Sequence, residues 1–261
     1  MIRRRRNPRW AVILVAVGLQ AVGASAARAQ GTEPFAIRGR TLTLRVLGPS
    51  TGDPVIVASG DGGWIHVGPD VADTLARVGY RVVGLDSKEY LSTFTRGSTR
   101  LSEADVPRDF SALVAFAARG HVQKPILIGV SEGAGLCVLA GADPGTKSAI
   151  RGVVVLGLPD FNELGWRWKD ALIYLTKGVP DEPTFSVARI IDRLAPLPLA
   201  AIHSTHDEFV PVPVVNRLMD RARDPKRLWI IPASNHRFSG SEEEFRRCLL
   251  EAVAWVKAAG R

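Results

Sequence analysis

Residues 126–135 read Ile-Leu-Ile-Gly-Val-Ser-Glu-Gly-Ala-Gly, and this stretch decides the fold class. The apolar run Pro125–Ile128 is typical of a buried strand, and the small residues of Ala134–Gly141 are typical of a closely packed helix. Between them lies a Gly-x-Ser-x-Gly turn centred on Ser131. Glycines two residues before and after a serine let strand and helix cross closely. The stretch therefore predicts a strand, a sharp turn and a helix, with the Ser131 hydroxyl exposed.

The same turn would place backbone N–H groups beside whatever Ser131 attacks. We expect the N–H of Glu132 and the positive end of the helix dipole to stabilise a negatively charged oxygen there. A five-residue pattern is a weak signal, and a glycine-rich turn without chemistry is the alternative interpretation. The strand before the turn and the helix after it favour the catalytic interpretation.

The first 29 residues have the composition of a secretory signal peptide. Four arginines at 3–6 precede an apolar run from Trp10 to Leu19, and Ala-Arg-Ala follows at 27–29. This order is typical of a cleaved signal, so we expect export and cleavage after Ala29. The apolar run is shorter than the ~20 residues that span a membrane, which makes an uncleaved anchor the weaker alternative.

The net charge changes once this segment is set aside. The chain of 261 residues carries a formal charge of +8, and residues 1–29 contribute six arginines and no acid, so the remaining 232 residues carry +2. That balance does not support nucleic-acid binding. A chain of this length can form one domain with a full core, and we predict a single domain over residues 30–261.

Strand and helix signals alternate along this domain. Short apolar or alternating runs predict strands, and the longer segments between them predict helices. The predicted strands are 41–47, 54–58, 81–85, 125–128, 150–156, 197–203 and 227–231, and the predicted helices are 69–78, 103–119, 134–141, 212–221 and 241–259. The last helix opens with Ser-Glu-Glu-Glu at 241–244, a capping-box signature. The alternation indicates an α/β fold with a mostly parallel sheet covered on both faces.

Two later strands end next to residues that would complete a catalytic triad with Ser131. A serine nucleophile needs a base to take its proton and a carboxylate to orient that base. Asp207 follows the strand 197–203, and His236 follows the strand 227–231. Parallel strands bring their carboxyl ends to one edge, so the three side chains are predicted to meet there. Their chain order, Ser, Asp, His, is that of the α/β-hydrolase fold.

Each member of this triad has an alternative interpretation. Asp160, after the preceding strand, is a rival acid, and Asp207 could simply cap its loop. His236 could be a surface histidine, although no other histidine follows Asp207. His203, His206 and Asp207 also have metal-ligand spacing, but no further cluster completes such a site. We therefore predict neither a metal nor any other cofactor.

The glycine-rich loop Ser59–Trp64 is predicted to supply the second donor of an oxyanion hole. The N–H of Asp61 is the first choice of donor and that of Gly62 the second, and a tight turn without a ligand is the alternative. A carboxylate beside an oxyanion opposes the reaction unless it points away or pairs with a cation. We therefore hypothesise that Asp61, with Glu132, faces a positively charged part of the substrate.

Two cysteines in an exported chain invite a disulfide. Cys137 lies on the helix after the serine turn and Cys248 on the last helix, and those helices are predicted to cover opposite faces of the sheet. We therefore expect two buried free thiols.

Several motifs outside the serine turn are more specific than the turn itself. They are Ser-Gly-Asp-Gly-Gly-Trp at 59–64, Gly-Tyr at 79–80, Val-Val-Gly-Leu-Asp-Ser at 82–87, and Tyr90. Over residues 53–256 the chain resembles the bacterial virulence protein family of VirJ and the C-terminal half of AcvB. The resemblance implies a periplasmic α/β-hydrolase that acts on aminoacylated phosphatidylglycerol, releasing lysine from the lysyl lipid. For some members it also implies a link to type IV secretion.

The serine turn departs from that family's pattern, which usually reads Gly-Tyr-Ser-Phe-Gly-Ala-Asp. This chain has Val130, Glu132 and Gly135 at the differing positions. Aromatic neighbours replaced by valine and an acid are expected to reshape the pocket beside Ser131. The cationic head group of a lysyl lipid would suit Asp61 and Glu132.

Residues 157–190 interrupt the strand–helix alternation where hydrolases of this fold place a lid. The segment is aromatic, and we predict that Trp166 and Trp168 contact the substrate together with Trp64 of the earlier loop. The alternative is an aromatic lid that packs only on its own core.

The sequence thus predicts a periplasmic serine hydrolase that cleaves a carboxylic ester, with Ser131 as nucleophile, His236 as base and Asp207 as the acid that orients it. An aminoacylated phospholipid, peripheral membrane contact and a secretion-system link are the partners that the resemblance implies. Two alternatives stay open. One is a catalytically idle hydrolase fold that serves as a binding or secretion partner, and the other is a general esterase or thioesterase for small acyl substrates.

Overall fold

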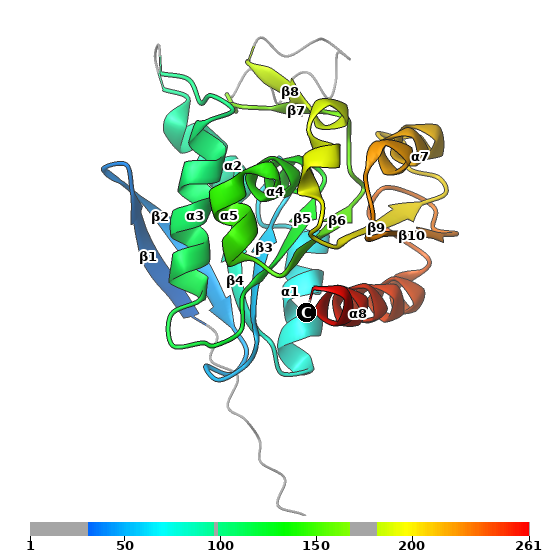
Figure 1. The fold of residues 1–261 in the computed structure, drawn as a ribbon, viewed down its shortest axis with the longest axis horizontal. Helices are drawn as coiled ribbons and strands as arrows, with labels where there is room; N and C mark the ends of the chain where they lie inside the picture. Colours follow the sequence, from blue (N-terminus) through cyan, green and yellow to red (C-terminus); the bar gives the residue numbers. More distant parts are fainter. Residues whose placement is uncertain (1–30, 97–98, 168–181, 261) are drawn as a thin grey trace, which may run out of the picture.

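The structure is a computed structural model and describes residues 31–96, 99–167 and 182–260. Its main element is an eight-stranded sheet in the order β1-β2-β4-β3-β5-β6-β9-β10 (Figure 1). The signal peptide predicted for residues 1–29 lies outside the described residues, and so do Trp168 and part of the predicted lid.

The sheet is mostly parallel, as predicted. Its strands are β1 (Gly31–Ile37), β2 (Arg40–Leu47), β3 (Pro54–Ala58), β4 (Arg81–Leu85), β5 (Ile126–Val130), β6 (Gly152–Leu156), β9 (Leu199–Ser204) and β10 (Lys226–Ile231). The pairs β1/β2 and β2/β4 are antiparallel, and every later neighbour in the sheet is parallel. β5, which carries the serine turn, therefore lies between β3 and β6 with its carboxyl end at the same edge as theirs.

Helices pack on both faces of this sheet. They are α1 (Val67–Arg77), α2 (Ser87–Phe94), α3 (Asp105–Ala117), α4 (Glu132–Ala142), α5 (Pro144–Ala149), α7 (Val212–Arg221) and α8 (Glu242–Ala259), with the short 3₁₀ helices η2 (Val187–Arg189) and η3 (Ile191–Leu194). Figure 1 shows α3, α4 and α5 grouped together and α1 beside α8. Ile56 of β3 packs in the core cluster of α3 and α4, whereas its neighbour Val57 packs in the cluster of α1 and α8. Alternate side chains of a strand point to opposite faces, so each β3 face has its own core.

Two features at the ends of the chain differ from the sequence prediction. β1 was not predicted, because its first residues are polar, yet it pairs with β2 and buries Phe35 and Ile37. The capping box predicted at 241–244 is wrong. The Ser241 hydroxyl donates to the carbonyl of Pro232 instead of capping α8.

The described part of the predicted lid is attached to the rest of the domain. β7 (Phe161–Glu163) and β8 (Thr184–Ser186) form a separate antiparallel pair. Asp160 Oδ1 accepts hydrogen bonds from the Ser186 hydroxyl at 2.8 Å and from the N–H of Ala188 at 2.9 Å. The Asn162 side chain packs so closely on α4 that a Cβ at Gly135 would lie 2.0 Å from it. This part of the segment is thereby fixed beside the serine turn.

The two cysteines are free and buried, as predicted. Cys137 lies in the cluster of α3 and α4, and Cys248 lies in the cluster of α1 and α8, so the sheet separates them. In the part of the chain that the structure describes, no helix combines the length and the apolar character needed to cross a bilayer.

Candidate active site

The serine turn is strained. Ser131 has φ 50° and ψ −117° at the position before α4, a backbone conformation that non-glycine residues rarely adopt. A Cβ at Gly129 would lie 2.3 Å from the carbonyl oxygen of Gly133, and a Cβ at Gly133 would lie 2.3 Å from that of Ser59. Both glycines are therefore required by close backbone crossings. The N–H of Ser131 donates to the carbonyl of Leu156 at 2.8 Å, which ties the turn to β6.

The loops after β9 and β10 bring Asp207 and His236 together. Nδ1 of His236 lies 2.6 Å from Oδ2 of Asp207. The other carboxylate oxygen, Oδ1, accepts the N–H groups of Phe209 at 3.0 Å and Val210 at 2.8 Å. Both oxygens of Asp207 are thus held, so the carboxylate has one orientation.

The charge of Asp207 is maintained although the residue is buried. Burial acts to raise the pKa of this carboxyl, but the hydrogen bond and charge of His236 and the N–H groups of Val210 and Phe209 outweigh it and lower the pKa below its ordinary value. An ionised Asp207 accepts the proton on Nδ1 of His236. In the neutral imidazole this leaves Nε2 with a free lone pair, as a general base requires.

Two neighbours of the imidazole were not predicted from the sequence. The Phe209 ring meets the His236 ring edge to face, with centroids 5.4 Å apart. Gly157, directly after β6, has φ +60°, and a Cβ there would lie 2.5 Å from Cε1 of His236. The only signal in the sequence was a glycine at the carboxyl end of the strand beside the nucleophile strand. The reason for a glycine at this position is evident only from the place of the His236 ring against it.

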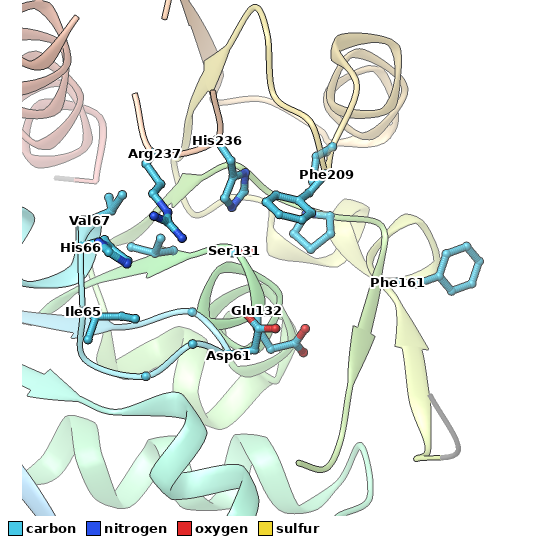
Figure 2. Close-up of a pocket in the computed structure, with 16 residues that line it drawn as sticks. Asp61, Ile65, His66, Val67, Ser131, Glu132, Phe161, Phe209, His236 and Arg237 are labelled. Atoms are coloured by element: carbon cyan, nitrogen blue, oxygen red, sulfur yellow. The ribbon is translucent and has the colours of Figure 1, made fainter. Parts of the chain in front are cut away.

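Ser131 and His236 line one pocket of about 420 Å³ (Figure 2). A Cβ at Gly60 would be 3.5 Å from Cβ of Ser131, which places the glycine-rich loop against Ser131. The remaining lining includes Asp61, Gly62, Glu132, His66, Arg237 and the apolar residues Ile65, Val67, Pro159, Phe161, Phe209 and Val210. The N–H of Glu132 is at the first position of α4, where helical N–H groups have no partner within their own helix. It is therefore available to an oxyanion.

Two acidic side chains lie together in the pocket that Ser131 lines. Figure 2 shows the carboxyl groups of Asp61 and Glu132 next to one another. Burial, and then the charges of Asp61 and Glu163, raise the pKa of Glu132 well above its ordinary value. Burial also raises the pKa of Asp61, while the N–H groups of Gly62 and Asp61 itself lower it in part. Oε1 of Glu132 accepts the N–H of Glu163 at 2.7 Å, which links α4 to β7. The pocket therefore holds a carboxyl pair that retains protons more readily than free carboxyls do.

Two of the tryptophans predicted to contact the substrate, Trp64 and Trp166, do not line this pocket among the described residues. The Trp64 ring lies against β4, where a Cβ at Gly84 would be 2.2 Å from it. Trp166 carries the ammonium of Lys88 4.2 Å above its ring and packs at the edge of the core. The third predicted contact, Trp168, lies outside the described residues.

The other acid and the other histidines considered from the sequence have different partners in the structure. Asp160 is occupied by its two bonds to residues 186 and 188, and the imidazole of His236 pairs with Asp207. His203 lies 2.8 Å from the carbonyl of Val210, and Nδ1 of His206 lies 3.0 Å from that of Ala233. Within the described ranges, no three His, Cys, Asp or Glu side chains are grouped as metal ligands would be.

Comparison with known proteins gives one family and one curated relative. The model of the family described as bacterial virulence protein (VirJ) matches residues 53–213. The UPF0284 protein glr4139 of Gloeobacter violaceus is 28% identical over 163 residues, which cover 56% of this chain and 43% of that protein. The match thus spans less than half of the curated relative's length.

Solved structures share the fold at low identity. Est1E from Butyrivibrio proteoclasticus has a TM-score of 0.65 at 17% identity, covering 87% of this chain and 99% of its own. Dienelactone hydrolase from Anabaena variabilis has a TM-score of 0.62 at 16% identity, covering 87% and 98%. A membrane phospholipase A, described as a novel bacterial virulence factor, has a TM-score of 0.63 at 11% identity, covering 87% of each chain. These likenesses show the α/β-hydrolase fold, and the reaction has to be argued from the site.

Proposed function

Because this chain belongs to the bacterial virulence protein (VirJ) family and has the α/β-hydrolase fold, we propose that it is a serine hydrolase that cleaves a carboxylic ester. One observation carries the proposal. His236, held by Asp207 at 2.6 Å, lines the pocket that Ser131 also lines from a strained turn. Structural roles alone do not require a buried carboxylate, an imidazole and a strained serine at one pocket.

In the proposed reaction the Ser131 hydroxyl attacks the ester carbonyl while Nε2 of His236 takes its proton. Asp207 stabilises the imidazolium that forms. The N–H of Glu132 and an N–H of the loop at Asp61 bind the oxyanion of the tetrahedral intermediate. The intermediate collapses to an acyl-serine as His236 returns the proton to the leaving alkoxide. Water, deprotonated by His236, then releases the acid and restores Ser131.

The carboxyl pair indicates a substrate with a positive group near the scissile bond. Asp61 and Glu132 lie on the pocket wall beside Ser131, and a bound cation would favour their ionised forms. We propose an aminoacyl ester, with the lysyl ester of phosphatidylglycerol as the first candidate, hydrolysed in the periplasm. Ile65, Phe161 and Phe209 line the same pocket and are 52%, 71% and 59% exposed, which suits contact with the apolar part of a lipid at a membrane surface.

A fluorophosphonate probe tests the catalytic assignment, because it reacts only with an activated serine. We expect the wild type to be labelled and Ser131→Ala to be unlabelled. Ser148→Ala is the control, since this hydroxyl only donates to the carbonyl of Gly145 in α5. If wild type and Ser131→Ala give the same signal, the enzyme proposal fails and a binding or secretion role is left.

The substrate class is tested with two esters that share the scissile bond and differ in whether the acyl group carries positive charge. A lysyl ester and its diacetylated derivative present the same backbone with and without positive groups. We expect the wild type to prefer the lysyl ester and Asp61→Asn to lose most of that preference. Equal rates on both esters, unchanged in Asp61→Asn, would leave a general esterase. In cells, lipid extracts should accumulate aminoacylated phospholipid when the protein is absent.

A further inference from the structure

A fully buried histidine lies beneath the acid of the triad. His203, in β9, has no exposed surface and does not line the pocket. Its Nε2 lies 2.8 Å from the carbonyl oxygen of Val210 and 4.0 Å from Oδ2 of Asp207. Its Nδ1 is buried without a hydrogen-bond partner among the described residues. An imidazole buried with one nitrogen unsatisfied costs free energy, so a purely structural filler would be better made of carbon.

The partner atom fixes the tautomer of His203. A carbonyl oxygen can only accept, so Nε2 carries the proton and Nδ1 does not. Burial lowers the pKa of His203, and the charge of His236 lowers it further, which together outweigh the opposite effects of Asp207 and the Val210 carbonyl. The ring is therefore neutral. A second positive charge next to Asp207, which would compete with His236 for the carboxylate, is avoided.

A continuous set of hydrogen bonds joins His203 to the triad. Nε2–H of His203 donates to the carbonyl of Val210, and the N–H of Val210 donates to Oδ1 of Asp207 at 2.8 Å. Oδ2 of Asp207 accepts from Nδ1 of His236 at 2.6 Å. The donor on β9 thus holds the carbonyl of Val210, the residue whose N–H holds one carboxylate oxygen, and the other oxygen faces the imidazole.

We propose that His203 is a positioning residue of the active site, which holds the turn 207–210 so that Asp207 faces His236. This role rests on the proposed serine hydrolase function. It acts through Asp207 and makes no contact with substrate. Loss of the Nε2–H donor leaves the Val210 carbonyl buried and unpaired, so the turn can rotate away and the His236–Asp207 contact loosens.

The experiment compares His203→Phe, which fills the space without a donor, with His203→Gln, whose side-chain amide can still donate to Val210. His206→Phe is the matched control, because His206 is an exposed histidine in the loop that follows β9 and carries Asp207. Three quantities are measured: kcat and KM for an ester, the pH dependence of kcat/KM, and the downfield proton NMR signal of the hydrogen bond between His236 and Asp207. The NMR signal needs no substrate, so it tests the inference even if no ester is hydrolysed.

For His203→Phe we expect kcat to fall about 10-fold or more with KM nearly unchanged, since a loosened catalytic group costs rate and not binding. The acidic limb of the pH profile moves to lower pH, because Asp207 stabilises the protonated imidazole less. The NMR signal broadens or disappears. His203→Gln recovers most of each effect, and His206→Phe resembles the wild type. A folded His203→Phe with the wild-type NMR signal would overturn the inference, and so would a His203→Gln as impaired as His203→Phe. If the wild type shows no hydrolysis that depends on Ser131, that result would count against the proposed function alone.

Discussion

Replacing Gly157 by alanine asks whether the imidazole of His236 has to lie where the structure places it. The added methyl group would be 2.5 Å from Cε1 and 3.0 Å from Nδ1 of His236. Non-bonded carbon atoms prefer separations of about 3.5–4.0 Å, so the ring has to move by about 1 Å. A displacement of that size in a catalytic group costs about 10²-fold in rate, or about 2.7 kcal/mol of transition-state stabilisation. We therefore expect kcat/KM for ester hydrolysis to fall about 100-fold.

Backbone strain has to be separated from this displacement. Gly157 has φ +60°, where alanine costs about 1–2 kcal/mol. Gly120 has φ +74°, and a Cβ there would meet no heavy atom within 4 Å among the described residues beyond its chain neighbours. Gly120→Ala therefore carries a similar backbone penalty without touching His236. Urea unfolding should show a loss of stability in both variants, while only Gly157→Ala loses activity. Equal kcat/KM in the two variants would refute the placement of the imidazole.

Three further predictions follow from buried groups. Burial and neighbouring carboxylates raise the pKa of Glu132, so the folded protein holds this proton more tightly than the unfolded chain does. The free energy of unfolding therefore falls as the pH rises from the ordinary glutamate range through the pKa of the folded state. Glu132→Gln should raise the melting temperature at about pH 8 and change it little at about pH 4; a lower value than wild type at the higher pH would contradict this. Asp160→Ala loses two hydrogen bonds and should cost about 1–3 kcal/mol in urea unfolding yet still be labelled by a fluorophosphonate, whereas Asp207→Ala should lose most labelling. The reverse result would make Asp160 the acid. Cys137 and Cys248, both buried, should react with a water-soluble disulfide reagent only after denaturation, and rapid reaction of the native protein would show that one of them is accessible.

The parts of the fold that could be predicted are those that a residue's own neighbours in the sequence determine. A strand such as β3, apolar at every position, can only be stable when both of its faces are covered. A mostly parallel sheet follows from repeating that pattern. Residues in the loops that follow the parallel strands, Asp207 and His236 among them, must then lie along one edge. Their order in the chain with Ser131 was enough to predict which side chains come together.

The features that could not be predicted depend on atoms far away in the sequence. The first residues of β1 are polar, and β2 beside them supplies the hydrogen bonds that make a strand. Trp64 belongs to a loop that lines the pocket, yet its ring lies under Gly84, whose missing side chain leaves the space. Ser241 had a better acceptor in the carbonyl of Pro232 than the helix it precedes. In each case a distant partner decided the outcome, and the local pattern carried no information about it.

The carboxyl pair beside Ser131 sets the strongest constraint on the chemistry. An oxyanion that forms near the first N–H of α4 is repelled by any ionised carboxylate near it. At a separation of about 6 Å and an effective dielectric constant of about 20, one such charge costs about 3 kcal/mol, or about 10²-fold in rate. The raised pKa of Glu132 favours its protonated form, and protonation there removes one of the two charges.

Asp61 is left, and its charge can be offset without cost to the reaction by a cation that belongs to the substrate. Such a cation attracts the developing oxyanion as well as the carboxylate. The cation therefore stabilises the transition state more than the ground state, and its removal should change kcat as well as KM. A neutral ester would bind in the same pocket and then, wherever Asp61 is ionised, meet its uncompensated charge when the oxyanion forms. The site is thus expected to select charged substrates mainly in the chemical step after binding. Removal of the Asp61 charge should then raise the rate of hydrolysis of neutral esters and lower that of esters that carry an amine.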